Sequence, residues 1–220
     1  MKRETRNFKP EIEDIMKLYM PGPDPAGDAT RLRDLSVLIE QPSYHELRPC
    51  TGCTMPCPCS ASPTCTCLCG PQCVYVPVKM SSEGDRYPIE PKIVGLVFGF
   101  NSLRICPPFW SCEGHQYPDG SLQRVPQVWF YTRSLVYPRL LGDWLARMHF
   151  KKRIAHPWHI CVSYSERCLD TGFSLEPDFK MLKGFVLDEL QRDAAILSEA
   201  LVLEVRALAQ QYLDQYRAPA

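Results

Sequence analysis

The feature that most constrains this chain is a sulfur-rich stretch at residues 50–73. Eight of the twelve cysteines fall here, and the stretch contains no Asp, Glu, Lys or Arg. It has few apolar side chains, so burial alone cannot offset the entropy lost when its backbone is ordered. Disulfides or bound metal must therefore hold it together. The cysteines are Cys50, Cys53, Cys57, Cys59, Cys65, Cys67, Cys69 and Cys73.

The N-terminal residues decide between disulfides and metal. Residues 1–7 are charged, and no apolar segment of the signal-peptide type follows them. We therefore expect a cytoplasmic chain with reduced thiols, which favours metal ligation.

The cysteine spacing supports metal binding. Cys50 and Cys53 form a C-x2-C pair, whose short bite lets two sulfurs reach one tetrahedral ion. Eight thiolates could fill two four-cysteine sites or bridge two or three zinc ions. The sequence favours structural zinc, with an iron–sulfur cluster as the alternative, because the spacing does not match the bacterial ferredoxin run. A redox role, metal sensing and disulfides remain open.

Composition limits the remaining classes of function. Lys+Arg and Asp+Glu both count 25, so the net charge gives no indication of nucleic-acid binding. No apolar run reaches the roughly 18 residues that a membrane span needs. The 220 residues predict one main domain with appendages. We divide the chain into an N-terminal helical arm at 1–49, the Cys-rich segment and linker at 50–87, and an α+β domain at 88–220.

Hydrophobic periodicity predicts the elements. Within the α+β domain their order is helix, strand, strand, helix, strand, strand, helix. That order predicts an α+β two-layer sandwich, a four-stranded sheet with helices on one face. The expected helices are 11–19, 29–40, 90–103, 135–149 and 181–216, and the expected strands are 109–112, 127–132, 158–164 and 171–176.

Several boundaries rest on single residues. Asp28 is the expected cap of the helix at 29–40, and Pro91 the first position of the next. A buried strand over 93–100 is the rival prediction for that second helix. Gly114 is expected to form the turn that ends the first strand. We expect irregular chain at 74–87 and a loop at 118–126.

The long C-terminal helix carries an apolar stripe over most of its length. A helix that covers the sheet is the favoured interpretation. The alternative is an interface for homodimerisation or for another protein partner. The apolar stripe is longer than a four-stranded sheet can cover, and the apolar residues Ile196 and Leu203 lie outside it.

A second group of reactive residues lies at the end of a predicted strand. Cys112, Glu113 and His115 place a thiol, a carboxylate and an imidazole within four residues, beside Gly114. Cys112 could act as a nucleophile with His115 lowering its pKa, or both could bind a metal. The equally weighted alternative is a buried core thiol and a solvated histidine.

Residues of the later strands are further candidates for this group. His159 or Cys161 could approach Cys112 if their strands are neighbours, although edge or core positions are the favoured interpretation. Glu176 could face the same end of the sheet. Cys106 and Cys168 are isolated and are expected to be structural.

Short motifs carry a resemblance. Phe109–His115, together with the segments at 49–53 and 173–177, resembles an uncharacterised bacterial family with a Ser-Cys-Glu-Gly-His motif. Ser111–His115 is also similar to the Ser-Cys-Ser-Gly-Arg segment of the wybutosine-synthesis methyltransferase family, which acts on tRNA. The chain departs from that segment at Glu113 and His115. The second resemblance implies RNA modification, and it is the main reason to keep nucleic acid among the partners.

Two functions follow from the sequence. The first is a metal-binding protein with a structural cysteine cluster that acts by binding a partner. The second is an enzyme with Cys112, Glu113 and His115 at its site, related to redox chemistry or RNA modification.

Overall fold

The computed structural model describes residues 25–40, 76–163, 171–178 and 186–217. The elements follow the predicted order. They are α2 (Pro25–Glu40), α3 (Val76–Met80), α4 (Val94–Leu103), β1 (Pro108–Gln116), β2 (Leu122–Thr132), α5 (Val136–Phe150), β3 (Trp158–Ser163), β4 (Thr171–Pro177) and α6 (Leu187–Arg217).

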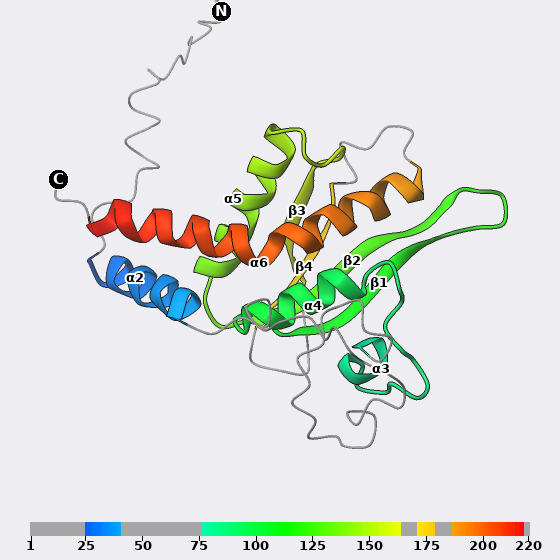
Figure 1. Cartoon of the computed structure of the whole chain (residues 1–220), viewed down its shortest axis with the longest axis horizontal. Coiled ribbons are helices and arrows are strands. Elements are labelled where there is room, and N and C mark those ends of the chain that lie inside the picture. Colours follow the sequence, from blue (N-terminus) through cyan, green and yellow to red (C-terminus); the bar gives the residue numbers. More distant parts are fainter. Residues whose placement is uncertain (1–24, 41–75, 164–170, 179–185, 218–220) are drawn as a thin grey trace, which may run out of the picture.

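The four strands form one antiparallel sheet in the order β1-β2-β4-β3. Val128 pairs with Leu175, and Phe130 with Phe173, and all four side chains are buried. They share one hydrophobic core with α2, α4, α5 and α6, so these helices cover one face of the sheet (Figure 1). The predicted α+β fold is confirmed, while the cysteine segment at 50–73 and the expected helix at 11–19 lie outside the described residues.

The helix at α4 is confirmed over the rival strand, but three helical details differ from expectation. Helix α2 begins at Pro25, so Asp28 lies in its first turn and is not its cap. Helix α4 begins at Val94 after a turn over residues 91–93, so Pro91 is not its first residue. The short helix α3 replaces part of the irregular chain expected at 74–87.

The turn between β1 and β2 was predicted at Gly114. The structure places it six residues later, at Gly120. Strand β1 continues to Gln116 and β2 begins at Leu122, so most of the expected loop at 118–126 is strand. The turn uses Gly120, with φ of 82°, and Asp119, whose carboxylate accepts hydrogen bonds from the Ser121 N–H and hydroxyl. Asp-Gly is a strong turn signal because Gly tolerates positive φ.

Helix α6 runs across the helical layer, and its apolar stripe is buried within the chain (Figure 1). Helices α2 and α4 extend the surface that covers the stripe beyond the sheet. Leu203, which lies off the stripe, is 65% exposed. A dimer seam is therefore not needed to bury the stripe, and homodimerisation stays a prediction.

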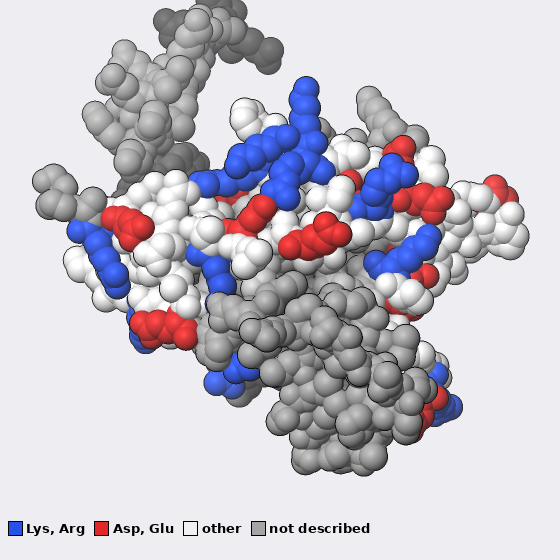
Figure 2. Space-filling model, viewed as in Figure 1, with Lys and Arg blue, Asp and Glu red and all other residues white. Residues whose placement is uncertain are grey.

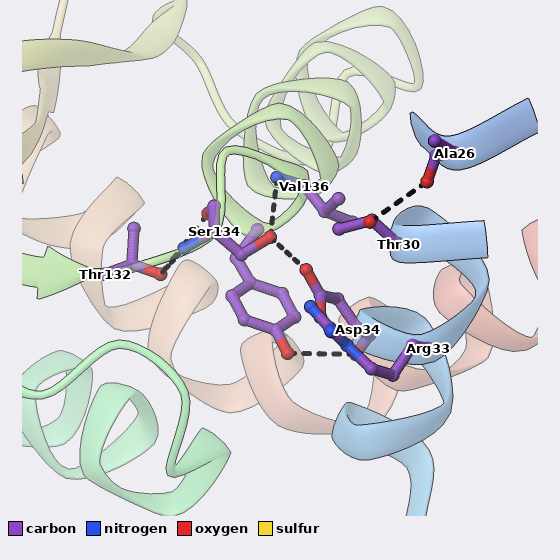
Figure 3. Close-up of polar contacts among 8 residues, drawn as sticks. Ala26, Thr30, Arg33, Asp34, Thr132, Ser134 and Val136 are labelled. Atoms are coloured by element: carbon purple, nitrogen blue, oxygen red, sulfur yellow. Dashed lines mark hydrogen bonds and ion pairs between the residues drawn. The ribbon is translucent and has the colours of Figure 1, made fainter. Parts of the chain in front are cut away.

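Helix α2 is joined to the start of α5 by polar contacts around Asp34. The Ser134 hydroxyl donates to the Asp34 carboxylate at 2.6 Å, and Arg33 also contacts that carboxylate (Figure 3). The Tyr137 hydroxyl donates to the backbone carbonyl of Asp34 at 2.9 Å. Burial, and secondarily the Asp34 charge, raise the pKa of Tyr137 to about 12.

A pH-dependent loss of stability follows from Tyr137. Its pKa is 10.0 without the fold and about 12 within it, so the folded state binds the proton more tightly. This contribution to the free energy of unfolding is fully present below pH 10. It falls by about 2 to 3 kcal/mol as the pH rises toward 12. Urea unfolding of Tyr137→Phe should show about 1 kcal/mol lower stability at neutral pH and a shallower alkaline decline. Tyr117→Phe, at an exposed position, is the control; an unchanged alkaline slope in Tyr137→Phe would contradict the assignment.

The surface agrees with the balanced composition. On the face seen in Figure 2, Lys and Arg are interspersed with Asp and Glu over the described part of the chain. No helix among the described residues is both long enough and apolar enough to cross a membrane.

Candidate metal centre

Three potential metal ligands meet beside β1, which is an edge strand of the sheet. A carboxylate oxygen of Glu90, the thiol of Cys112 and a ring nitrogen of His115 all lie within 4.8 Å of one another. His115 Nε2 is 3.0 Å from Glu90 Oε1. Cys112 is buried, whereas His115 and Glu90 are partly exposed.

Gly114 explains how Cys112 and His115 come together. In a regular strand, residues three apart point to opposite faces. Gly114 lies between them with φ of 87°, which interrupts that alternation. Only glycine adopts this conformation without steric cost. The predicted closeness of Cys112 and His115 is therefore observed, although the strand continues through Gly114.

Glu90 reaches the site from the segment that precedes α4. Its backbone carbonyl accepts hydrogen bonds from the N–H groups of Ile93 and Val94, so it lies at the start of that helix. Its Oε2 accepts a hydrogen bond of 2.6 Å from the backbone N–H of Glu113. Glu90 therefore satisfies a donor on the free edge of β1 while its other oxygen faces His115.

Glu113, predicted as a site residue, lies on the other side of the strand. Ser111 pairs with the core residue Val128, so Glu113, two residues on, also faces the helices. Its carboxylate accepts a hydrogen bond from the Lys92 N–H at 2.8 Å. Its carbonyl accepts one from Gln191 of α6 at 3.0 Å. Glu113 thus links β1 to the helical layer, and Glu90 is the carboxylate beside Cys112.

The electrostatics keep the Cys112 thiol protonated in the absence of a cation. Burial raises the pKa of Cys112 most strongly. The Gly114 N–H opposes this rise, the Glu90 charge adds to it by a smaller amount, and Arg124 lowers the pKa slightly. Arg124 also lies over the Trp110 ring, 5.5 Å from its centroid. A buried thiol beside a carboxylate would be stabilised as a thiolate by a divalent cation.

The other predicted cysteines and histidines occupy different places. The eight cysteines of the segment at 50–73, and Cys168, lie outside the described residues. Cys106 is fully buried, which raises its pKa, in keeping with the expected structural role. His159 and Cys161 lie on β3, at the opposite edge of the sheet from β1. The favoured prediction of edge positions is therefore confirmed, and the alternative, an approach to Cys112, is not observed. Glu176 pairs with His159 and not with β1.

Glu90 is the site residue that the sequence analysis missed. It is 22 positions before Cys112, and no local spacing connects the two. The only signal was its position ahead of the apolar run that forms α4, at the start of the domain. No family model, curated protein or solved structure matches this chain.

Proposed function

We propose that the protein binds zinc, and that Glu90, Cys112 and His115 hold one ion beside β1. The observation that carries this proposal is the convergence of three different ligand types within 4.8 Å. They come from a strand and from a segment more than twenty residues earlier, so the fold brings them together. The range of metals that suit this site is narrow, because a thiol, an imidazole and a carboxylate are the three ligand types that zinc prefers.

Charge and ligand softness favour zinc over other common ions. Calcium and magnesium prefer oxygen ligands, and a thiolate does not suit them. A divalent ion would offset the repulsion between the Cys112 thiolate and the Glu90 carboxylate. The same ion would accept a lone pair of His115.

Three protein ligands leave one tetrahedral position for water or substrate, as in catalytic zinc sites. The His115 and Glu90 side chains are 43% and 35% exposed, so the open position would face solvent. A bound zinc ion lowers the pKa of its water toward neutrality. Metal-assisted hydrolysis is therefore the class of reaction that this site supports.

The eight cysteines from Cys50 to Cys73 form the second part of the proposal. Their spacing supports two four-cysteine zinc sites or two to three zinc ions that share bridging sulfurs, with an iron–sulfur cluster as the alternative, in a reducing, cytoplasmic setting. Saturated cysteine sites are inert, so this segment would act through structure and through binding a protein partner.

A thiol enzyme is the alternative function, and the His115–Glu90 contact of 3.0 Å favours it. In that arrangement Cys112 would be the nucleophile, His115 the base, and Glu90 the group that orients the base. Zinc added to metal-free protein should block iodoacetamide labelling of Cys112 if the residue is a ligand. Labelling that zinc does not slow, and that His115→Gln does slow, would favour the thiol enzyme.

Metal content tests the zinc proposal directly. Reduced full-length protein is saturated with zinc and desalted, and its zinc is measured by elemental mass spectrometry. Glu90→Gln, Cys112→Ser and His115→Gln should each hold about one ion per chain fewer than the parent, since three ligands share one ion.

Glu113→Gln is the matched control, because Glu113 adjoins Cys112 in sequence but contacts Lys92 instead. It should retain the parent's zinc content. Parental zinc content in His115→Gln, or an equal loss in Glu113→Gln, would contradict the proposal.

A further inference from the structure

A second group of metal-ligating side chains lies on the opposite edge of the sheet. A ring nitrogen of His159, the thiol of Cys161 and a carboxylate oxygen of Glu176 all lie within 4.8 Å of one another. His159 and Cys161 belong to β3, and Glu176 belongs to β4. All three residues are partly exposed, so the group lies near the surface of the protein.

Strand register places these residues on one face. Ile160 pairs with the core residue Leu175 and therefore faces the helices. Alternation then directs His159 and Cys161 to the other face, and Glu176 joins them there as the cross-strand partner of His159. Side chains of directly paired residues are about 5 Å apart, within the reach of one shared ion. The group thus results from regular pairing and does not depend on an unusual loop.

The ring of His159 lies beside two carboxylates, those of Glu176 and Asp178. Its Nε2 atom is buried and has no hydrogen-bond partner among the described residues. Glu176 Oε1 lies 3.7 Å from Nε2, which is too far for a hydrogen bond. Two ligands at about 2.1 Å from one tetrahedral ion are about 3.4 Å apart, so this separation is close to that of a shared zinc.

A second carboxylate faces the other ring nitrogen. Asp178 Oδ2 lies 3.7 Å from His159 Nδ1. Asp178 is two residues beyond Glu176, and its N–H donates to the Pro157 carbonyl at 2.8 Å, which fixes it beside the start of β3. A carboxylate beside the far nitrogen of a metal-binding histidine favours one ring orientation and raises the basicity of the ring. At 3.7 Å Asp178 does this through its charge and not through a hydrogen bond.

The geometry points to a second zinc site, in which His159 Nε2, Cys161 and Glu176 bind the ion and Asp178 orients His159. It is separate from the Glu90–Cys112–His115 site, because three strand spacings, about 14 Å, separate β1 from β3. An ion held from both strands would fasten the edge strand β3 to β4. The inference does not depend on the proposed function.

Imidazole spectroscopy tests it in the intact chain. The chain has only five histidines, so their side-chain resonances can be separated in long-range proton–nitrogen spectra of reduced, metal-free protein. Zinc should shift the Nε2 signal of His159, assigned from its absence in His159→Gln. His156, whose Nδ1 lies 3.0 Å from the Asp193 carboxylate, is the internal reference and should not shift.

Metal content provides the second measurement. Cys161→Ser and Glu176→Gln should each hold about one zinc ion per chain fewer than the parent. Val162→Thr, at an exposed position of the same strand, should retain the full content. An unshifted His159 signal in zinc-saturated parent would overturn the inference, even if a variant fails to fold. If zinc shifts the His159 signal but not the His115 signal, the site on β3 and β4 is upheld and the Glu90–Cys112–His115 site is refuted. If zinc shifts only the His115 signal, the Glu90–Cys112–His115 site is upheld and the site on β3 and β4 is refuted.

Discussion

Replacing Asp193 with Ala should lower the free energy of unfolding by about 3 to 5 kcal/mol. Asp193 lies in α6 and is 2% exposed. Its carboxylate accepts hydrogen bonds from the N–H groups of Ala155 and His156 at 2.8 and 2.9 Å, and it lies 3.0 Å from the His156 ring. The substitution would leave these donors without a partner inside the protein, which costs more than the loss of one surface contact.

Urea unfolding at neutral pH measures this loss. Asp193→Asn keeps one acceptor oxygen and should fall between the parent and Asp193→Ala. Asp188→Ala, in the exposed first turn of the same helix, is the control and should change stability by less than about 1 kcal/mol. An Asp193→Ala protein as stable as that control would show that the carboxylate carries no such role.

A double-mutant cycle separates the His156 contact from the two backbone contacts. Combining Asp193→Ala with His156→Ala should reveal a coupling energy of about 1 to 2 kcal/mol. The remaining loss belongs to the backbone N–H groups, which hold the segment between α5 and β3 against α6. Because β3 follows this segment directly, Asp193→Ala should disturb His159 more than His115, which the same imidazole spectra can compare.

The fold could be read from the sequence because the signals were local. Apolar spacing identified α4 and α5, and short runs rich in aromatic and β-branched residues, flanked by turn residues, identified the strands. The errors arose where tertiary contacts decide a boundary, as when β1 continues through Gly114. The Asp119-Gly120 pair carries a turn signal in the sequence, and it lies within the loop expected at 118–126.

Only part of the candidate metal site could be predicted from the sequence. Cys112 and His115 were found because they are close in sequence. Glu113 was included for the same reason, although strand alternation directs it away from Cys112. Glu90 could not be found, because only the packing of α4 beside β1 brings its carboxylate to them. The strand order, which separates Cys112 from His159, also depends on long-range pairing that the sequence does not show.

Gly114→Ala should both destabilise the protein and weaken zinc binding. A Cβ at this position would lie 2.6 Å from Leu187 Cδ1 and 2.9 Å from the backbone nitrogen of Pro126, with φ at 87°. The left-handed conformation costs about 1 to 2 kcal/mol and overpacking about 1 to 3 more, so we expect a loss of about 3 kcal/mol. Relief of the clash would rotate Cys112 and His115 apart, which should weaken zinc binding at that site at least about tenfold.

Gly120→Ala is the matched control for this prediction. Gly120 also has a positive φ, at 82°, but nothing lies within 4 Å of the added Cβ. It should lose only the cost of the backbone conformation, about 1 kcal/mol, and bind zinc as the parent does. Thermal unfolding and zinc titration of both variants make the comparison. If Gly114→Ala matches Gly120→Ala in both measurements, the close packing at Gly114 does not set the geometry of Cys112 and His115.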